Sequence, residues 1–464
     1  MLDGFGRGVH AACRYLAPRT TDELAAAIAA AAEADLPVTL RGAGRSYGDA
    51  ALGRRGLVVD TTGLDRILAW DPATGVVDAE PGVTIEQLWR ETLADGYWPK
   101  VVPGTMRPTL GGCLAANVHG KNQFRVGTIG EHVLGFELLT ADGARRWCSP
   151  TEDPELFHAT IGGFGLLGAI TRIRLRLGRV PGGRLQVTAT SAPSLDALMD
   201  AFEAALPSAD YAVGWIDAFA RGGGLGRGEL HTARYADATV DPDGAAWLDP
   251  ARQDLPSTIL GVPRAVVWRL LRLGTHRPGT FAVNTAKYLA ARMADGKEYL
   301  QGHVAFAFLL DYVPNWRLAY GPRGFIQVQV FVPHAAARAA LREVLAAGHA
   351  TAREPYLAVL KRHRPDPFLL THGLDGWSLA LDCPVPDGGL AALRPLTDRL
   401  TAITLDAGGR FYFAKDAMLA PADVAQAWGR ARLDAFAAVR RRVDPAGRFT
   451  SDLAERVGLV TSAR

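Results

Sequence analysis

The stretch Val38-Thr-Leu-Arg-Gly-Ala-Gly-Arg-Ser-Tyr-Gly-Asp49 joins a short β-branched run to a loop with three glycines and almost no apolar side chains. Such a loop leaves several backbone N–H groups free to face an anion, which is how proteins hold phosphates. A G-x-G-x-x-G dinucleotide fingerprint would need glycine at position 47 and a helix after it. Position 47 is Tyr47, and residues 49–56 carry no helical apolar period. The stretch therefore predicts a phosphate loop outside the NAD-binding class.

Two later stretches share the abundance of small residues. Pro103-Gly-Thr-Met-Arg-Pro-Thr-Leu-Gly-Gly-Cys-Leu-Ala-Ala-Asn-Val-His-Gly-Lys-Asn122 has small residues at almost every turn, and Gly162-Gly-Phe-Gly-Leu-Leu-Gly168 precedes an alternating run over 170–177. Small residues at this density allow the backbone to approach a flat ligand closely.

In this order and spacing, the three stretches resemble the FAD-binding (PCMH-type) domain of the vanillyl-alcohol-oxidase family. Further motifs resemble the decaprenylphosphoryl-β-D-ribose 2'-oxidase branch of that family: Arg41-Gly-x-Gly-Arg-Ser-Tyr-Gly-Asp49, Val118-His-Gly-Lys-Asn122, Leu138-Leu-Thr-Ala-Asp-Gly143, Phe411-Tyr-x-Ala-Lys-Asp416, Ala319-Tyr-Gly-Pro-x-Gly-Phe-x-Gln327 and Val443-Asp-Pro-x-x-x-Phe-x-Ser-Asp452. The resemblance extends from about Tyr15 to Leu459 and is weakest between residues 235 and 305.

The resemblance implies an α+β fold with the two domains of the vanillyl-alcohol-oxidase type. We expect a PCMH-type FAD-binding domain over 1–180, a substrate-binding domain with an antiparallel sheet over 181–405, and a C-terminal segment over 406–464 that returns to the FAD domain. Strands and helices mix without the regular alternation of a doubly wound sheet, which agrees with this class.

Local patterns predict several individual elements. Thr20-Thr-Asp-Glu23 predicts a capping box before a helix over 24–34, and Thr84 predicts the cap of another helix with Gln87 at its third position. Alternation or β-branched residues predict strands at 57–60, 67–70, 76–79, 211–217 and 325–332, and apolar periodicity predicts helices at 196–206 and 335–347. The end of the chain predicts a strand that ends at Lys415 and one helix from Pro421 to Arg442.

Composition bounds the class of protein. A chain of 464 residues, 48% hydrophobic and 21% charged, is an ordinary globular protein of about two domains. Its net charge of +3 is too small to indicate a nucleic acid partner. No apolar run of membrane-spanning length occurs, and the N-terminus lacks the apolar core of a secretory signal. The scattered cysteines Cys13, Cys113, Cys148 and Cys383 have no metal-binding spacing, so we expect buried free thiols and no metal.

The resemblance assigns cofactor contacts to the small-residue stretches and to the C-terminal motif. The residues expected to bind FAD are Arg41, Gly42, Ala43, Gly44, Arg45, Ser46, Tyr47, Gly48, Asp49, Gly104, Thr109, Leu110, Gly111, Gly112, Ala116, Asn117, Val118, His119, Ile170, Tyr412 and Lys415. Related enzymes that tether FAD covalently often carry histidine where this chain has Arg45. We therefore expect non-covalent FAD.

A flavin oxidises an alcohol by taking hydride while a base removes the hydroxyl proton. Lys415 suits the base or relay if burial lowers its pKa, and His119 and Tyr47 are the other expected catalytic residues. The expected substrate contacts are Trp215, Gln327, Gln329, Lys361, Ser378 and Ala380. The branch that this chain resembles often has asparagine, and cysteine in mycobacteria, where this chain has Ser378 and Ala380, so the exact substrate stays open.

The expected reaction is oxidation of a secondary sugar hydroxyl, with the 2'-OH of polyprenylphosphoryl-β-D-ribose as the first candidate in arabinose-donor synthesis. The partner would then be a short-chain reductase that completes the epimerisation. The alternatives are an alditol or free-sugar oxidase and a flavin-binding protein without this activity. The sequence leaves open whether oxygen or another acceptor reoxidises the flavin, and it also leaves the oligomeric state open.

The segment Pro263-Arg-Ala-Val-Val-Trp-Arg-Leu-Leu-Arg-Leu273 has two interpretations. It is either a surface helix that packs its apolar stripe inward or a short basic amphipathic segment at a lipid surface. We expect a cytoplasmic protein with at most peripheral membrane contact.

Overall fold

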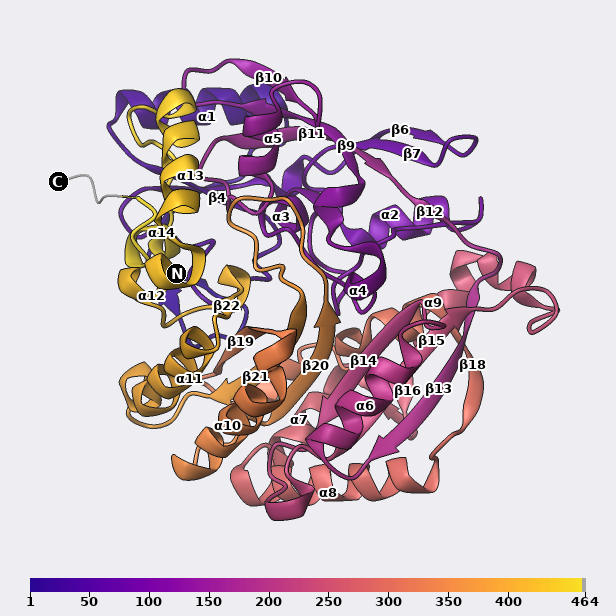
Figure 1. Cartoon of the computed structure of the whole chain (residues 1–464). Coiled ribbons are helices and arrows are strands. Elements are labelled where there is room, and N and C mark those ends of the chain that lie inside the picture. Colours follow the sequence, from indigo (N-terminus) through magenta and orange to yellow (C-terminus); the bar gives the residue numbers. More distant parts are fainter. Residues whose placement is uncertain (461–464) are drawn as a thin grey trace.

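The computed structural model describes residues 1–460 (Figure 1). The strands are β1 (Leu2–Asp3), β2 (His10–Ala11), β3 (Arg14–Leu16), β4 (Val38–Arg41), β5 (Leu57–Asp60), β6 (Ile67–Asp71), β7 (Val76–Ala79), β8 (Tyr97–Trp98), β9 (Val133–Leu139), β10 (Arg145–Cys148), β11 (Ala169–Arg176), β12 (Gly178–Arg179), β13 (Arg184–Ala192), β14 (Tyr211–Ile216), β15 (Gly228–Tyr235), β16 (Thr258–Ile259), β17 (Val262–Pro263), β18 (Glu298–Gly302), β19 (Phe325–Pro333), β20 (Leu357–His363), β21 (Gly376–Pro384) and β22 (Arg410–Phe411). The helices are α1 (Thr21–Glu33), α2 (Ile85–Thr92), α3 (Leu110–Ala115), α4 (Gln123–Val126), α5 (Pro154–Thr160), α6 (Leu195–Ala205), α7 (Arg264–Gly274), α8 (Arg277–Met293), α9 (His303–Ala307), α10 (Ala337–Ala350), α11 (Arg394–Asp406), α12 (Pro421–Trp428), α13 (Arg430–Val443) and α14 (Asp452–Arg456).

The N-terminal part of the chain forms two larger sheets, in the upper half of Figure 1, and two two-stranded ones, β1-β2 and β12-β8. Strands β3, β5 and β4 make a small parallel sheet, and β10, β9, β11, β7 and β6 make an antiparallel one. The phosphate loop leaves the end of β4 directly, because the β-branched run terminates where the glycines begin. The parallel sheet therefore sets the position of the loop.

The middle of the chain builds an eight-stranded antiparallel sheet in the order β18-β13-β15-β14-β20-β21-β19-β22. Helix α6 packs against one face, since a Cβ added at Gly214 would lie 3.2 Å from the Phe202 ring of that helix. Trp215, the next residue of β14, has its side chain on the opposite face and lines a cavity there. The larger sheets are antiparallel and mixed with helices, which is an α+β arrangement.

The end of the chain returns to the N-terminal sheets. After β22, helices α12, α13 and α14 lie beside the N-terminal elements (Figure 1). The Val38 amide of β4 donates to the Arg448 carbonyl (2.7 Å), and the Thr450 amide donates to the Val38 carbonyl (2.9 Å). The Arg456 guanidinium binds the carboxylates of Asp49 and Asp416, each at 2.8 Å. These contacts attach β4 and the loop after it to the C-terminal segment.

Most predicted elements occur where the patterns place them. Thr84 and Gln87 form the full capping box of α2, whereas at α1 only the Thr20 hydroxyl accepts, from the Glu23 amide. The Glu23 carboxylate turns instead to the Arg19 amide (2.7 Å), so that capping box is half formed. All four cysteines are free thiols, but Cys13 is half-buried rather than buried.

Two predictions near the C-terminus are wrong. The strand after the glycine turn ends at Phe411, and Lys415 closes a single 3₁₀ turn over Phe413–Lys415. The predicted long helix is divided in two by Gly429, whose positive φ of 78° ends α12 before α13 begins. Glycine adopts this left-handed conformation at little cost, so the break needs no proline.

Candidate functional site

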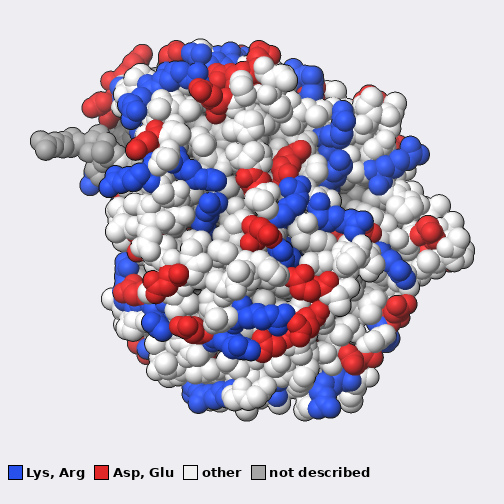
Figure 2. Space-filling view, viewed as in Figure 1, with Lys and Arg blue, Asp and Glu red and all other residues white. Residues whose placement is uncertain are grey.

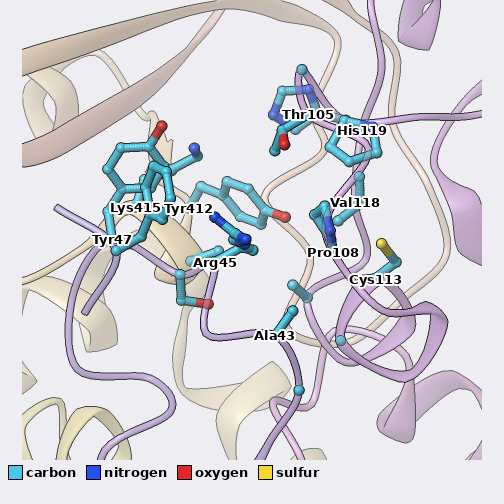
Figure 3. Close-up of a pocket in the computed structure, with 18 of the residues that line it drawn as sticks. Ala43, Arg45, Tyr47, Thr105, Pro108, Cys113, Val118, His119, Tyr412 and Lys415 are labelled. Carbon is cyan, nitrogen blue, oxygen red and sulfur yellow. The ribbon is translucent and has the colours of Figure 1, made fainter. Parts of the chain in front are cut away.

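One cavity of ≈ 470 Å³ lies between the N-terminal loops and the eight-stranded sheet. This volume is in the range of small-molecule and cofactor sites. In Figure 3 the phosphate loop enters from below with Ala43 and Arg45, Lys415 lies beside the Tyr47 ring, and His119 stands across the cavity with Val118.

The wall near the phosphate loop consists of backbone and small side chains. It contains Gly42, Ala43, Gly44, Gly104, Gly111, Gly112, Ala115, Ala116, Gly165 and Gly168. A Cβ at Gly42 would lie 2.3 Å from the Thr109 hydroxyl, and one at Gly111 would lie 2.7 Å from Pro81. The glycines therefore let three loop segments pack together while their backbones stay exposed to the cavity.

The opposite wall is one face of the eight-stranded sheet. Trp215, Val359, Ala380 and Gln329 are paired in register across β14, β20, β21 and β19, so they form one row. Residues two positions along each strand add to the same face, because side chains alternate along a strand. Gln327, Leu357 and Lys361 reach the cavity in this way.

The charge on the cavity wall has one sign. Among residues 1–460, the wall carries no aspartate or glutamate, and its cations are Arg41, Arg45, Lys121, Lys287, Lys361 and Lys415. Burial lowers the pKa of Lys121 to about 7 and the pKa of Lys361 to about 8. An anion in the cavity would offset this burial cost, since an opposite charge favours the protonated form.

Lys415 has a specific environment at the centre of the site. Its Nζ lies 3.7 Å from the centroid of the Tyr47 ring. Burial lowers the pKa of Lys415 to about 7, although the nearby Asp382 carboxylate acts in the opposite direction. Burial also raises the pKa of Asp382 to about 6, and this carboxylate accepts from the Gln327 amide and, at 3.5 Å, from the Tyr320 hydroxyl. Lys415 is therefore able to gain or lose a proton near neutral pH.

His119 belongs to a buried cluster of three imidazoles. Its ring lies 4.9 Å from that of His363 and 5.1 Å from that of His372, centroid to centroid. The Gln329 amide donates to His119 Nε2 (3.1 Å) and to the Ser378 hydroxyl (3.0 Å), and that hydroxyl contacts His363 Nε2 (2.7 Å). Burial holds the pKa of His119 well below its usual range. His119 is accordingly a neutral, oriented ring.

Five residues of the predicted site do not line the cavity. They are Gly48, Asp49, Leu110, Asn117 and Ser378. Gly48 lies against the backbone of Asp416, and the Asp49 carboxylate forms an ion pair with Arg456. Leu110 is buried in the core. Asn117 accepts from the Gly130 amide, and Ser378 stands behind Gln329. These residues support the wall rather than form it. Every other predicted site residue lines the cavity.

Several residues of the site were missed from the sequence. Asp382 follows the apolar residues 379–381 of β21, and a single acid at the end of such a run is a signal of a buried carboxylate. Lys287 and His231 come from α8 and β15, where the sequence carries no recognisable motif. The Lys287 ammonium lies 4.0 Å from the centroid of the Trp215 ring.

Comparison with known proteins places the chain in a flavin-binding class. A family profile described as an FAD binding domain matches residues 13–149. The chain is 36% identical over 187 residues to cytokinin dehydrogenase 6 of Oryza sativa subsp. japonica, covering 38% of this chain and 36% of the relative. The protein is an FAD-dependent oxidoreductase, and FAD is its cofactor.

Two further relatives match over most of their length. Decaprenylphosphoryl-beta-D-ribose oxidase of Mycolicibacterium smegmatis is 32% identical over 467 residues, covering 99% of this chain and 97% of the relative. An uncharacterised Streptomyces coelicolor protein is 34% identical over 389 residues, covering 81% of this chain and all of the relative. The chain belongs to the decaprenylphosphoryl-β-D-ribose oxidase family.

Proposed function

We propose that this enzyme oxidises a secondary hydroxyl of a phosphate-linked sugar, with the 2'-OH of polyprenylphosphoryl-β-D-ribose as its substrate and the 2'-keto sugar as its product. The observation that carries the proposal is the group of lysines that the wall holds in addition to Arg41 and Arg45, with no carboxylate on the wall, because a neutral polyol gains nothing from their charge. The printed name of the Mycolicibacterium smegmatis relative supports the same substrate class.

The residues present fit FAD. The glycine and alanine wall admits close backbone contact, Arg41 and Arg45 supply charge for a pyrophosphate, and the cavity continues to Lys415 and His119. When bound there, FAD supplies the acceptor for the hydride that leaves the carbinol carbon. We infer non-covalent attachment, because Arg45 is no nucleophile and burial raises the pKa of the Cys113 thiol to about 12.

The residues around the sugar have separate tasks in this proposal. Neutral Lys415 accepts the proton of the reacting hydroxyl, and the Asp382 carboxylate stabilises the ammonium that results. His119, held by Gln329, presents a neutral nitrogen to the same region. Lys361 pairs with the substrate phosphate, and Trp215 forms the wall of the sugar site.

We also propose that the domains divide at residues 180 and 405, with the two-domain arrangement of the vanillyl-alcohol-oxidase type. The keto sugar that leaves the site would be consumed by a reductase that restores a hydroxyl of opposite configuration. The short-chain reductases suit this role chemically.

The test is anaerobic loss of the visible flavin absorbance of the purified holoenzyme. Farnesylphosphoryl-β-D-ribofuranose is compared with ribitol and xylitol at equal concentrations. Bleaching by the lipid-linked sugar alone is expected. Bleaching by the polyols would move the enzyme to the alditol oxidases, and no bleaching by any of the three would refute oxidation of both substrate classes.

A further inference from the structure

The segment over 255–294, called here the 255–294 surface, is unusual in charge. It contains no aspartate or glutamate, and its basic side chains are Arg264, Arg269, Arg272, Arg277, Lys287 and Arg292. Arg277 is bound by Glu354, but Arg269, Arg272 and Arg292 are exposed and make no ion pair within residues 1–460. In Figure 2 the lower edge of the molecule, where Figure 1 places α8, shows blue and white atoms.

Helix α8 presents its apolar residues to solvent. Its buried stripe is Thr280, Asn284, Tyr288 and Ala291. The opposite stripe at helical spacing is Ala282, Ala286, Leu289, Ala290 and Met293, all of them exposed. A helix on the surface of a globular protein normally has the reverse pattern, with the polar face outward. The outer face of α8 therefore indicates contact with something apolar.

The neighbouring elements extend this apolar surface. Leu260, at the turn between β16 and β17, is completely exposed and has a positive φ of 49°. A bulky residue rarely adopts this conformation, and hairpin turns of this kind prefer asparagine or glycine. On α7, Leu270 and Leu273 are exposed beside Arg269 and Arg272, while Val267 is the buried residue of the helix.

We propose that the 255–294 surface docks on an anionic lipid bilayer, with α7, α8 and the Leu260 turn lying in the interface. Exposed leucines and methionine next to unpaired arginines are the composition of interfacial helices. Arginines near a membrane surface are attracted to anionic lipids, and the absence of acids removes the opposing repulsion. No helix within residues 1–460 is long and apolar enough to cross a membrane.

The docking surface adjoins the site. Helix α8 carries the apolar stripe on its outer side and sends Lys287 to the Trp215 ring in the cavity. A bilayer bound to α8 would therefore lie close to the sugar site. The delivery of a lipid-linked substrate from the bilayer to the cavity rests on the proposed function. Binding of the bilayer itself does not depend on the identity of the substrate.

The test is flotation of the holoenzyme with vesicles of phosphatidylcholine alone or of equimolar phosphatidylcholine and phosphatidylglycerol. The charge variant is R269E/R272E, and the apolar variant is L260S/M293S. The matched control is R430E/R441E, because these two arginines of α13 are exposed and form no ion pair within the described residues. Far-UV circular dichroism and the bound flavin spectrum verify that each variant is folded.

We expect the wild type and R430E/R441E to bind the anionic vesicles and to bind neutral vesicles at least about tenfold less. R269E/R272E and L260S/M293S should each lose at least about tenfold of the anionic binding. Absence of vesicle binding, or equal loss in R430E/R441E, would overturn the proposal. A dimer in analytical ultracentrifugation that both surface variants abolish, without vesicle binding, would assign the surface to a second copy of the chain instead. Flavin bleaching is measured separately from flotation. If the proposed substrate does not reduce the flavin, the flotation result still tests bilayer binding.

Discussion

Replacement of Lys415 by arginine is expected to slow flavin reduction strongly although it keeps the positive charge. With a pKa of about 7, about half of the lysine is neutral at pH 7, whereas at the usual 10.5 only about one molecule in 3,000 would be. Arginine stays protonated in proteins and accepts no proton. A positioned base contributes about 10²- to 10⁴-fold, so K415R and K415A should both slow flavin reduction by that factor.

The assay is anaerobic stopped-flow measurement of flavin reduction by farnesylphosphoryl-β-D-ribofuranose across neutral pH. The neutral form of Lys415 is the active one, so the wild-type rate constant should rise as the pH increases through about 7 and then level off. In D382N the rising limb should move to lower pH, because the carboxylate that favours the ammonium is gone. The bound flavin spectrum controls for misfolding.

Two results would refute this reasoning. A K415R rate within about threefold of the wild type would show that Lys415 acts only as a cation, since a lost base costs at least about 10²-fold. A rate constant that does not change with pH between about 5 and 9 would show that no group with a pKa near 7 controls the step.

Three further changes test the rest of the site and its support. Lys361→Met should raise the KM for the phosphorylated sugar about 10- to 100-fold with little change in kcat, and the wild-type KM should itself rise as the pH passes about 8, where Lys361 loses its charge. Gly42→Ala should raise the Kd for FAD at least about tenfold in fluorescence titration, because its Cβ would displace the start of α3, while Gly223→Ala has open space and should leave the Kd unchanged. Arg456→Met should lower the free energy of unfolding in urea by about 3–5 kcal/mol, since it leaves two buried carboxylates without their partner, whereas the exposed Arg441→Met should stay within about 0.5 kcal/mol.

Each of these predictions has a contrary outcome. A changed kcat with a constant KM would move Lys361 from binding to chemistry. Equal FAD affinity of Gly42→Ala and wild type would show that the loop around Gly42 can move away from α3 without weakening FAD binding. Coincident urea transitions for Arg456→Met and Arg441→Met would show that protonation or hydration of the two carboxylates replaces the ion pairs without a loss in the free energy of unfolding.

Much of the site could be predicted because it follows from local composition. The small residues over 103–122 and in the loop after β4 leave their backbones accessible, and many of them line the cavity. The period of two in β19 likewise puts Gln327 and Gln329 on one face before any partner strand is known. The caps of α1 and α2 are readable for the same reason, because a cap involves residues only three positions apart.

Long-range packing decided what the sequence by itself left open. The sequence determined the glycine-rich loops and the strand faces, because these depend on glycine, side-chain size and alternation within a few residues. Only the tertiary structure brings Asp382 near Lys415, places Lys287 on Trp215 and gathers His119 with His363 and His372. The shifted pKa of Lys415 and the outward apolar face of α8 have the same origin: burial is set by what packs against a side chain, and that partner comes from a distant part of the chain.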